Sequence, residues 1–299
     1  MSLTIFANFR IDDQDRFERL KKSFFSFNKA NIDKWVINTR GKLKSEVNKF
    51  LSENIKQNFE LFNIQLKKGW FEETRFLLSE IKTDYVFIWN EDHINLKDTA
   101  YFDKVILELK ICNVDTFTYS FFVKGDLPRS FEIEEAIKTN KIIYLNYNEK
   151  VHEKRLNFIK RTQSKGQNYI ISLVSIMKRN LFEKIILTND PPIKRWSKFT
   201  PFDFEKGPED IHWLPFIFAA PREEFFTCID KDWDKDGNVI LLDKQDFPKN
   251  KIKFRKKIFM RIYKIAKFFL KPIVINTREM LNRKITNYKI KKNKLFFIN

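Results

Sequence analysis

The sequence predicts an α/β fold, in which a mostly parallel sheet is flanked by helices and followed by a basic helical C-terminal extension. Within residues 1–120, apolar segments of strand length alternate with amphipathic segments of helical period. Hydrophobic residues make up 43% of the 299 residues, including 33 Phe, which supplies a sizeable core. Residues 244–299 carry 18 Lys and Arg against two acids, a net charge of +16, whereas residues 1–243 are close to neutral. These observations predict an enzyme-like body with a basic appendage.

The elements follow from the hydrophobic period. In the first part of the chain we expect strands over 3–9, 35–37, 59–66 and 85–89. Between and after them the 3.6-residue period predicts helices over 17–27, 43–51, 70–81 and 102–109. This alternation favours parallel strands with right-handed crossovers. Further along we expect strands over 114–123, 141–147 and 169–176, a helix over 179–187, and little periodicity over 190–221.

Scarce glycine and cysteine exclude several classes of site. No two of the six glycines lie within ten positions of each other, which removes the P-loop, the dinucleotide-binding turn and the nucleophile elbow. Cys112 and Cys228 stand too far apart in sequence to indicate a disulfide framework or a cysteine-based zinc site. We therefore expect a reducing, cytoplasmic compartment. We also expect no signal peptide and no transmembrane helix.

Polar residues follow three of the predicted strands. They are the segments Asn8-Phe9-Arg10, Asn38-Thr39-Arg40 and Asn90-Glu91-Asp92-His93. Ligands of such sheets sit at the carboxyl ends of the strands. Carboxylates there are suited to hold Mg²⁺ or Mn²⁺ against a diphosphate. The alternative is a polar strand end that carries no ligand.

The order of these elements resembles the GT-A fold (Rossmann-like) glycosyltransferases, especially family 2, over residues 1–240. The resemblance implies that Asp92 binds a metal, Mn²⁺ or Mg²⁺, that grips the diphosphate of a nucleotide-sugar donor. Asn90 stands where the family has the first Asp of its D-x-D motif, and Glu91 is the residue that could substitute for it. The implied nucleotide-sugar contacts are Ala7, Asn8, Arg10, Arg40, Asn90 and Glu91. Members of the family often have an Asp after the second strand that recognises the nucleotide base, and this chain has Asn38-Thr39-Arg40 there. The resemblance therefore does not predict which base the donor carries.

The same resemblance implies catalytic roles for Glu209 and Asp210. In inverting members a later Glu-Asp pair supplies the general base that deprotonates the acceptor hydroxyl. A late His can be a further metal ligand in this family, which makes His212 a candidate and His93 a weaker one. The alternative for either histidine is an ordinary packed or capping residue.

The basic tail has the pattern of an amphipathic helix over 258–271, with Lys and Arg on one face and apolar residues on the other. Such a helix is typical of an anionic membrane interface. We therefore expect residues 250–272 to hold the protein on the inner membrane face as a peripheral protein. Packing against its own body and RNA binding are the alternatives, and nucleic acid is the less favoured partner. The segment after Pro272 could equally be a dimerisation element, so a homo-oligomer stays open.

A second motif, residues 232–243, matches part of the spacing of a calcium-binding loop. A hairpin turn at Asp236-Gly237 is the simpler interpretation.

In sum, we expect a nucleotide-binding half (1–123), an acceptor half (124–243) and a basic tail (244–299). The function expected is glycosyl transfer to a glycan or lipid-linked acceptor in cell-surface polysaccharide synthesis. The alternatives are a nucleotidyltransferase acting on a sugar phosphate and a non-catalytic RNA- or membrane-binding protein.

Overall fold

The computed structural model describes residues 2–67, 69–120, 136–162, 170–187 and 201–229. The chain divides into two units, Met1–Ile240 and Leu241–Asn299, and every described residue belongs to the first. The predicted calcium loop and the predicted basic helix both lie outside the described residues. The sequence expectations about them therefore stay predictions.

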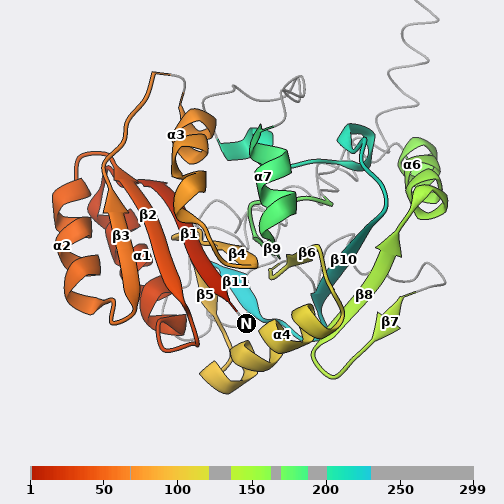
Figure 1. The fold of residues 1–299 in the computed structure, drawn as a ribbon, viewed down its shortest axis with the longest axis horizontal. Coiled ribbons are helices and arrows are strands. Elements are labelled where there is room, and N and C mark those ends of the chain that lie inside the picture. Colours follow the sequence, from red (N-terminus) through yellow and green to blue (C-terminus); the bar gives the residue numbers. More distant parts are fainter. Residues whose placement is uncertain (1, 68, 121–135, 163–169, 188–200, 230–299) are drawn as a thin grey trace, which may run out of the picture. The chain divides into compact units, whose positions relative to one another are not determined.

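The described residues form a nine-stranded sheet with strand order β3-β2-β1-β4-β9-β6-β10-β8-β7 (Figure 1). Its strands are β1 (Leu3–Arg10), β2 (Lys34–Arg40), β3 (Asn58–Phe62), β4 (Tyr85–Ile88), β6 (Thr116–Thr118), β7 (Ile137–Lys138), β8 (Ile142–Tyr147), β9 (Ser175–Lys178) and β10 (Phe216–Pro221). Strands β3, β2, β1 and β4 are parallel neighbours, and β6 is parallel to β10. Strands β8 and β9 run against the others. The predicted mostly parallel α/β sheet is confirmed.

Helices cover both faces of this sheet (Figure 1). The side chains of β1 alternate between two hydrophobic clusters, since Leu3 and Ile5 belong to one and Phe6 to the other. The first cluster includes residues of α1 (Gln14–Phe27), α2 (Lys44–Asn54) and α4 (Thr99–Ile111). The second includes residues of α3 (Trp70–Leu77), α6 (Glu149–Thr162) and α7 (Arg179–Leu187). The period-two pattern of the strands thus builds a three-layer fold.

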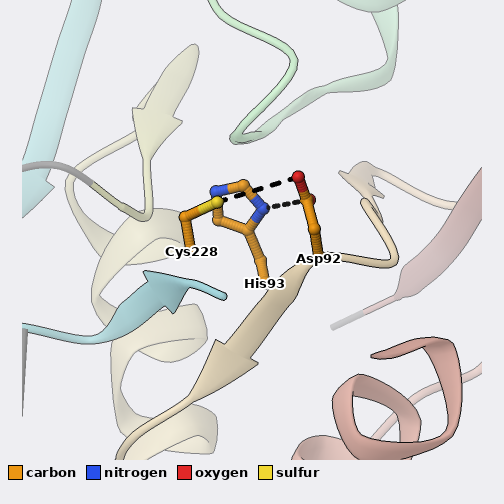
Figure 2. A group of neighbouring side chains, drawn as sticks. All are labelled: Asp92, His93 and Cys228. Atoms are coloured by element: carbon orange, nitrogen blue, oxygen red, sulfur yellow. Dashed lines mark hydrogen bonds and ion pairs between the residues drawn. The ribbon is translucent and has the colours of Figure 1, made fainter. Parts of the chain in front are cut away.

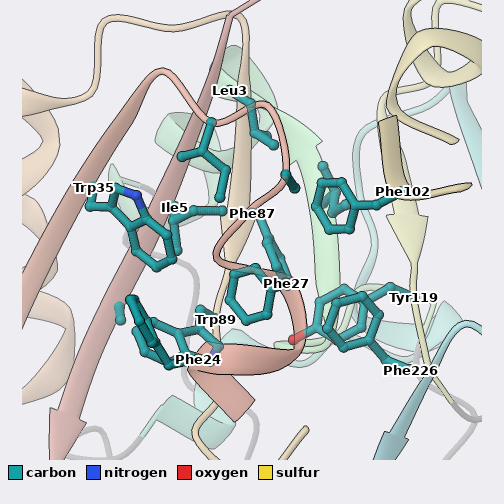
Figure 3. Packing of buried hydrophobic residues seen from close by; sticks show 14 of the residues in the cluster. Leu3, Ile5, Phe24, Phe27, Trp35, Phe87, Trp89, Phe102, Tyr119 and Phe226 are labelled. Atoms are coloured by element: carbon teal, nitrogen blue, oxygen red, sulfur yellow. The ribbon is translucent and has the colours of Figure 1, made fainter. Parts of the chain in front are cut away.

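Many residues of the first cluster are aromatic, and their rings pack against one another (Figure 3). Phe27 of α1 stacks on Trp35 with ring centroids 5.7 Å apart and meets Trp89 edge-on at 5.6 Å. The helix starts at the N-cap Asp13, whose side chain accepts a hydrogen bond from the Arg16 amide at 2.9 Å. This packing fixes α1 against the end of β4, so Arg16 is held beside Glu91, which follows that strand.

Several element boundaries differ from those predicted. The strand expected over 169–176 is β9, which begins only at Ser175, because the backbone bends at residues 173–174 directly before it. The strands expected over 59–66 and 114–123 are shorter, ending at Phe62 and Thr118. The stretch 190–221 contains an unpredicted strand, β10, and the 3-10 helices η2 (Pro201–Phe204) and η3 (Pro208–Asp210). A further 3-10 turn, η1 (Leu78–Glu80), follows α3.

A separate two-stranded sheet pairs β5 (His93–Asn95) with β11 (Phe226–Cys228), antiparallel. It joins the segment after β4 to the segment after β10. Within the described part of the chain, no helix has the length and apolar character needed to cross a membrane.

Candidate active site

The strand order reverses between β1 and β4: β2 and β3 lie on one side of β1, and β4 lies on the other. In open α/β sheets, this reversal opens a crevice at the carboxyl ends of the two strands, where ligands bind. Arg10 ends β1, Arg40 ends β2, and Asn90-Glu91-Asp92 follow β4. The structure therefore brings these predicted residues to one edge of the sheet.

Asn90 anchors the end of β4. Its side-chain amide donates to Tyr119 Oη at 3.2 Å and to the Leu173 carbonyl at 3.1 Å. The Tyr119 hydroxyl donates in turn to the Ile88 carbonyl at 2.9 Å. These bonds occupy the amide hydrogens of Asn90 and tie β4 to β6 and to the segment before β9. The acidic residues that follow are thus carried on a fixed turn.

Glu91 lies against α1. Its carboxylate accepts from Arg16 Nε at 3.0 Å and also contacts Arg16 Nη2, while only 13% of its side chain is exposed. Burial and the neighbouring Asp92 charge raise the pKa of Glu91, and Arg16 acts in the opposite direction. The Arg16–Glu91 pair thereby places a cation beside the acidic turn, with 38% of the arginine side chain exposed.

Asp92, His93 and Cys228 converge from two segments (Figure 2). Asp92 Oδ1 lies 2.6 Å from His93 Nδ1, and the Cys228 thiol lies 3.7 Å from Asp92 Oδ2. The pairing of β5 with β11 sets His93 opposite Cys228, and the Ile229 amide donates to the Asp92 carbonyl at 2.7 Å. Burial acts to raise the pKa of Asp92, but the charge and hydrogen bond of His93 prevail and lower it. Asp92 is therefore held as a carboxylate.

The donor set at this point suits a divalent metal. A carboxylate and an imidazole are ligands that Mn²⁺ accepts, whereas Mg²⁺ prefers oxygen alone. The side chain of Asp92 is 25% exposed, while His93 is buried. Asp92 and His93, both named from the sequence, belong to this group. His212 does not belong to it and is exposed after η3. Burial lowers the pKa of His152 on α6, and the charge of His212 adds to this effect.

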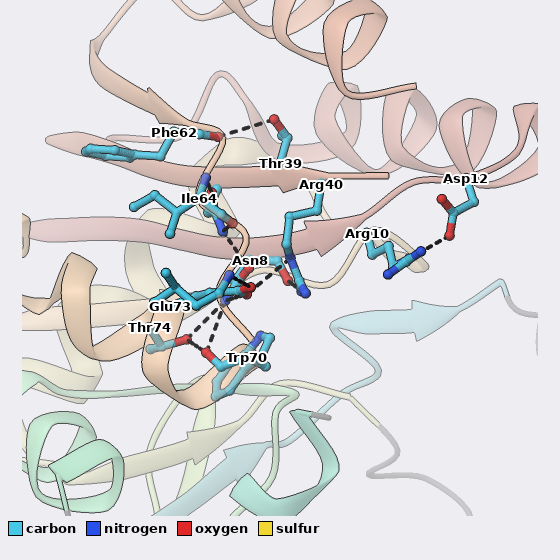
Figure 4. A network of polar contacts seen from close by, with 12 residues as sticks. Asn8, Arg10, Asp12, Thr39, Arg40, Phe62, Ile64, Trp70, Glu73 and Thr74 are labelled. Atoms are coloured by element: carbon cyan, nitrogen blue, oxygen red, sulfur yellow. Dashed lines mark hydrogen bonds and ion pairs between the residues drawn. The ribbon is translucent and has the colours of Figure 1, made fainter. Parts of the chain in front are cut away.

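Asn8 and Arg40 belong to a buried polar network that joins β1 and β2 to α3 (Figure 4). The Asn8 amide nitrogen lies 3.2 Å from the Trp70 carbonyl and 3.3 Å from Glu73 Oε2. Arg40 Nε lies 3.2 Å from the same carboxylate oxygen, close enough for an ion pair although its N–H is not aligned for a hydrogen bond. The side chain of Glu73 has 0% exposure. Asn8 and Glu73 therefore hold the Arg40 side chain in place.

The two remaining predicted nucleotide contacts differ in exposure. Ala7 is 1% exposed and its side chain belongs to the core, so a ligand could meet it only through its backbone. The side chain of Arg10 is 57% exposed and bonds Asp12 at 2.7 Å. This hydrogen bond, opposed by slight burial, lowers the pKa of Asp12. Arg10 is the more accessible cation of the two strand ends.

Gly41 allows β2 to turn tightly past the end of β1. Its φ is +96°, and an added Cβ would lie 2.3 Å from the Ile11 carbonyl oxygen. Two backbone hydrogen bonds fix this crossing, from Ile11 to Arg40 and from Leu43 to Ile11. Glycine is thus required where Arg40 enters the site.

Glu205 carries a partly buried carboxyl group that the sequence did not single out. Burial raises its pKa to about 7, against a weaker lowering effect of Ser172, whose hydroxyl lies 3.5 Å away. The next residue, Lys206, bonds the backbone of Ile171. Ser172 directly precedes Leu173, the residue that accepts from Asn90. Glu205 is thereby connected to the end of β4.

Glu209 and Asp210, the predicted catalytic pair, lie in η3, which packs against α6. Glu209 is exposed. Burial raises the pKa of Tyr147, the charge of Arg155 opposes this effect, and the charge of Glu209 adds to it. Its carboxylate folds back so closely that a Cβ at Gly207 would lie 2.9 Å from it. Their catalytic role stays a prediction.

No protein-family model matches the chain, and no curated protein sequence matches it. Among solved structures, it is similar to S. aureus TarS 1–349 in complex with UDP-GlcNAc, with a TM-score of 0.46 and 8% identity over 81% of this chain and 62% of that one. It is also similar to TarS 1–349 without a named ligand, with a TM-score of 0.45 and 10% identity over 76% of this chain and 60% of that one. A third is the mannosyltransferase PcManGT from Pyrobaculum calidifontis in complex with GDP-Man and Mn²⁺, with a TM-score of 0.35 and 10% identity over 61% and 46%.

The TM-scores of all three similarities lie below 0.5. The chain spans less than two thirds of the length of each of these structures.

Four residues of the site escaped the sequence analysis. Arg16 and Glu73 could have been suspected, since each is a charged residue in the first helical turns near a predicted strand end. Glu205 and Cys228 carry no local signal. Cys228 reaches the site through the pairing of β11 with β5, which spans 136 positions between Asp92 and Cys228.

Proposed function

We propose that this protein is a glycosyltransferase that takes a sugar from a nucleotide-sugar donor and passes it to a glycan or lipid-linked acceptor. The observation that carries the proposal is the Asp92 carboxylate, oriented by His93 at the point where the strand order reverses. A carboxylate at this edge is where a metal-bridged diphosphate would be held.

The donor diphosphate would meet Asp92 on one side and the arginines on the other. Arg10 is exposed at the end of β1, and Arg16 is partly exposed beside Glu91. Arginine suits this role because its guanidinium is always charged and can bind phosphate oxygens in pairs. The same cations would stabilise the charge that develops on the departing diphosphate. A bound Mn²⁺ or Mg²⁺ at Asp92 would supply Lewis-acid stabilisation of that charge.

The acceptor hydroxyl needs a base as it attacks the anomeric carbon. We assign this role to Asp210, assisted by Glu209, and propose inversion of configuration. The partly buried carboxyl group of Glu205 is a second candidate, because a base with a pKa of about 7 is well matched to neutral pH. Comparing Asp210→Asn with Glu205→Gln in sugar transfer decides between them, since loss of the base lowers kcat rather than donor affinity.

The proposal extends to the place where the protein acts. Residues 250–272 carry the basic pattern of an interfacial helix, which supports cytoplasmic, peripheral attachment to the inner membrane face and a role in surface polysaccharide synthesis. Replacing Lys257, Lys264 and Lys271 with Gln should reduce sedimentation with anionic vesicles, while binding to zwitterionic vesicles stays low throughout. Unchanged sedimentation would refute membrane attachment through this segment.

Thermal melts of the full chain with UDP, GDP, CDP, CMP and dTDP, each with and without Mn²⁺, test the donor site. A ligand at 100 times its Kd adds about 2.7 kcal/mol to the free energy of unfolding. We expect one nucleoside diphosphate to stabilise the protein in the presence of metal and not to stabilise Asp92→Asn. Glu53→Gln, an exposed change on α2, is the matched control. No response to any nucleotide would favour the binding-protein alternative.

A further inference from the structure

Cys228 adds a third metal-binding side chain to the Asp92–His93 pair (Figure 2). Ligand atoms of the three residues lie within 4.8 Å of one another. His93 and Cys228 are both 5% exposed, whereas the side chain of Asp92 is 25% exposed. The group is thus enclosed by protein on the imidazole and thiol sides and open at the carboxylate.

The spacing of this group suits a single ion. Zinc binds sulfur at about 2.3 Å and nitrogen or oxygen at about 2.0–2.2 Å, so tetrahedral ligand atoms stand roughly 3.3–3.6 Å apart. The distance of 3.7 Å between Cys228 Sγ and Asp92 Oδ2 is close to that separation. The shorter contact of 2.6 Å between His93 and Asp92 is a hydrogen bond, and it would lengthen by less than about 1 Å on coordination.

The chemistry of the three donors selects among cations. A thiolate is a soft ligand that favours Zn²⁺ and Co²⁺, and it is a poor ligand for Mg²⁺. Among divalent ions, affinity for a mixed site of this kind rises from Mn²⁺ through Co²⁺. Three protein ligands with one open position are typical of catalytic zinc sites, and here the open flank is that of Asp92.

We propose that Asp92, His93 and Cys228 together form a binding site for a thiophilic divalent cation, Zn²⁺ or Co²⁺, in preference to Mg²⁺. This deepens the proposed function by naming the class of ion at its site, and it rests on that function only for the role of the ion. The thiol of Cys228 is then a ligand as its thiolate, releasing one proton to solvent when the cation binds. The fourth position is left for an oxygen of the donor diphosphate.

The chain offers a matched control in its other cysteine. Cys112 follows α4 and is only partly buried, and it does not belong to the group around Asp92. Cys112→Ser and Cys228→Ser therefore make the same chemical change, one outside the group and one inside it. Melts without metal establish that both variants are folded.

The test uses the full-length protein, stripped with chelator and titrated with Co²⁺ in the absence of any nucleotide. We expect a thiolate-to-cobalt charge-transfer absorption in the wild type and in Cys112→Ser, bleached by Zn²⁺ and unaffected by excess Mg²⁺. Cys228→Ser should lack the absorption and bind Zn²⁺ at least about tenfold more weakly. No absorption in the wild type, its persistence in Cys228→Ser, or equal competition by Mg²⁺ would overturn the proposal.

The outcomes separate this inference from the proposed function. Cobalt binding at Cys228 with no stabilisation by any nucleotide would uphold the cation site and reject the transferase. Nucleotide binding that is equally strong with Mg²⁺ in the wild type and in Cys228→Ser would uphold the transferase and reject the thiolate ligand.

Discussion

Glu205→Gln should change how the stability of the protein depends on pH. Burial raises the pKa of Glu205 from 4.5 to about 7 in the folded chain. The folded state therefore binds a proton that the unfolded state releases between these two values. The contribution of this group to stability is fully present below pH 4.5 and is lost as the pH rises toward 7.

The magnitude follows from the same two values. At about 1.36 kcal/mol for each pKa unit, the change from 4.5 to about 7 amounts to roughly 3 kcal/mol of unfolding free energy. Partial exposure of Glu205 reduces this figure, so on the order of 2 kcal/mol is the expected effect. Gln keeps the shape and the hydrogen bond with Ser172 but cannot ionise.

Urea denaturation of the wild type and of Glu205→Gln at pH values from 5 to 8 measures the effect. Subtracting the two curves cancels the titration of every other group. The wild type should lose stability relative to Glu205→Gln as the pH rises, whereas Glu53→Gln, exposed on α2, should give a flat difference. A flat difference for Glu205→Gln would show that folding does not raise the pKa of Glu205, and a difference that rises with pH would show that folding lowers it; either result would refute the reasoning.

Further predictions concern the residues that shape the site. Glu73→Gln leaves the Arg40 guanidinium without its buried carboxylate. It should lower the free energy of unfolding, measured by urea denaturation, by about 3–5 kcal/mol. The control Glu72→Gln, on the same helix, should lower it by less than about 1 kcal/mol. Gly41→Ala forces a side chain into a left-handed conformation against the Ile11 carbonyl and should cost about 1–3 kcal/mol by the same measurement; a neutral result would reject the tight crossing. Arg10→Gln should weaken binding of the stabilising nucleoside diphosphate roughly tenfold in titration calorimetry, through loss of one charged hydrogen bond, with the melting temperature of the free protein unchanged; an unchanged Kd would remove Arg10 from the donor site.

The first half of the fold could be predicted because its signals are local. The apolar positions of α1, such as Phe17, Leu20 and Phe24, recur at helical spacing, and all of them are buried. The strands β1, β2 and β4 contain short apolar runs, and polar residues lie at or shortly after their ends. Each of these patterns can be read within about a dozen residues.

The second half depends on contacts between distant segments. The strand β10 lies in a stretch rich in Pro and aromatic residues, and its place between β6 and β8 is set by pairing rather than by period. The boundary of β9 was missed because residues 170–174 are apolar except for Ser172, although the backbone bends before the strand begins.

The candidate site divides in the same way. Asp92, Glu91 and Arg40 could be found because each follows a predicted strand. Two features of the site follow from contacts between distant segments, which leave no local pattern in the sequence. They are the hydrogen bond from Asn90 to Tyr119 and the presence of Cys228, rather than His212, beside Asp92. The general base, Asp210, was assigned by resemblance, and the structure adds Glu205 as a second candidate for that role.

Release of the nucleoside diphosphate from nucleotide sugars tests the central claim most directly, since water can serve as a slow acceptor. The full-length protein with Mn²⁺ or Zn²⁺ is incubated with UDP-, GDP- and dTDP-sugars, and the products are followed by mass spectrometry. We predict cleavage of one donor by the wild type and by Cys112→Ser, and none by Asp92→Asn at equal stability. Equal cleavage by Asp92→Asn, or pyrophosphate release from a nucleoside triphosphate and a sugar phosphate in place of donor cleavage, would contradict the account.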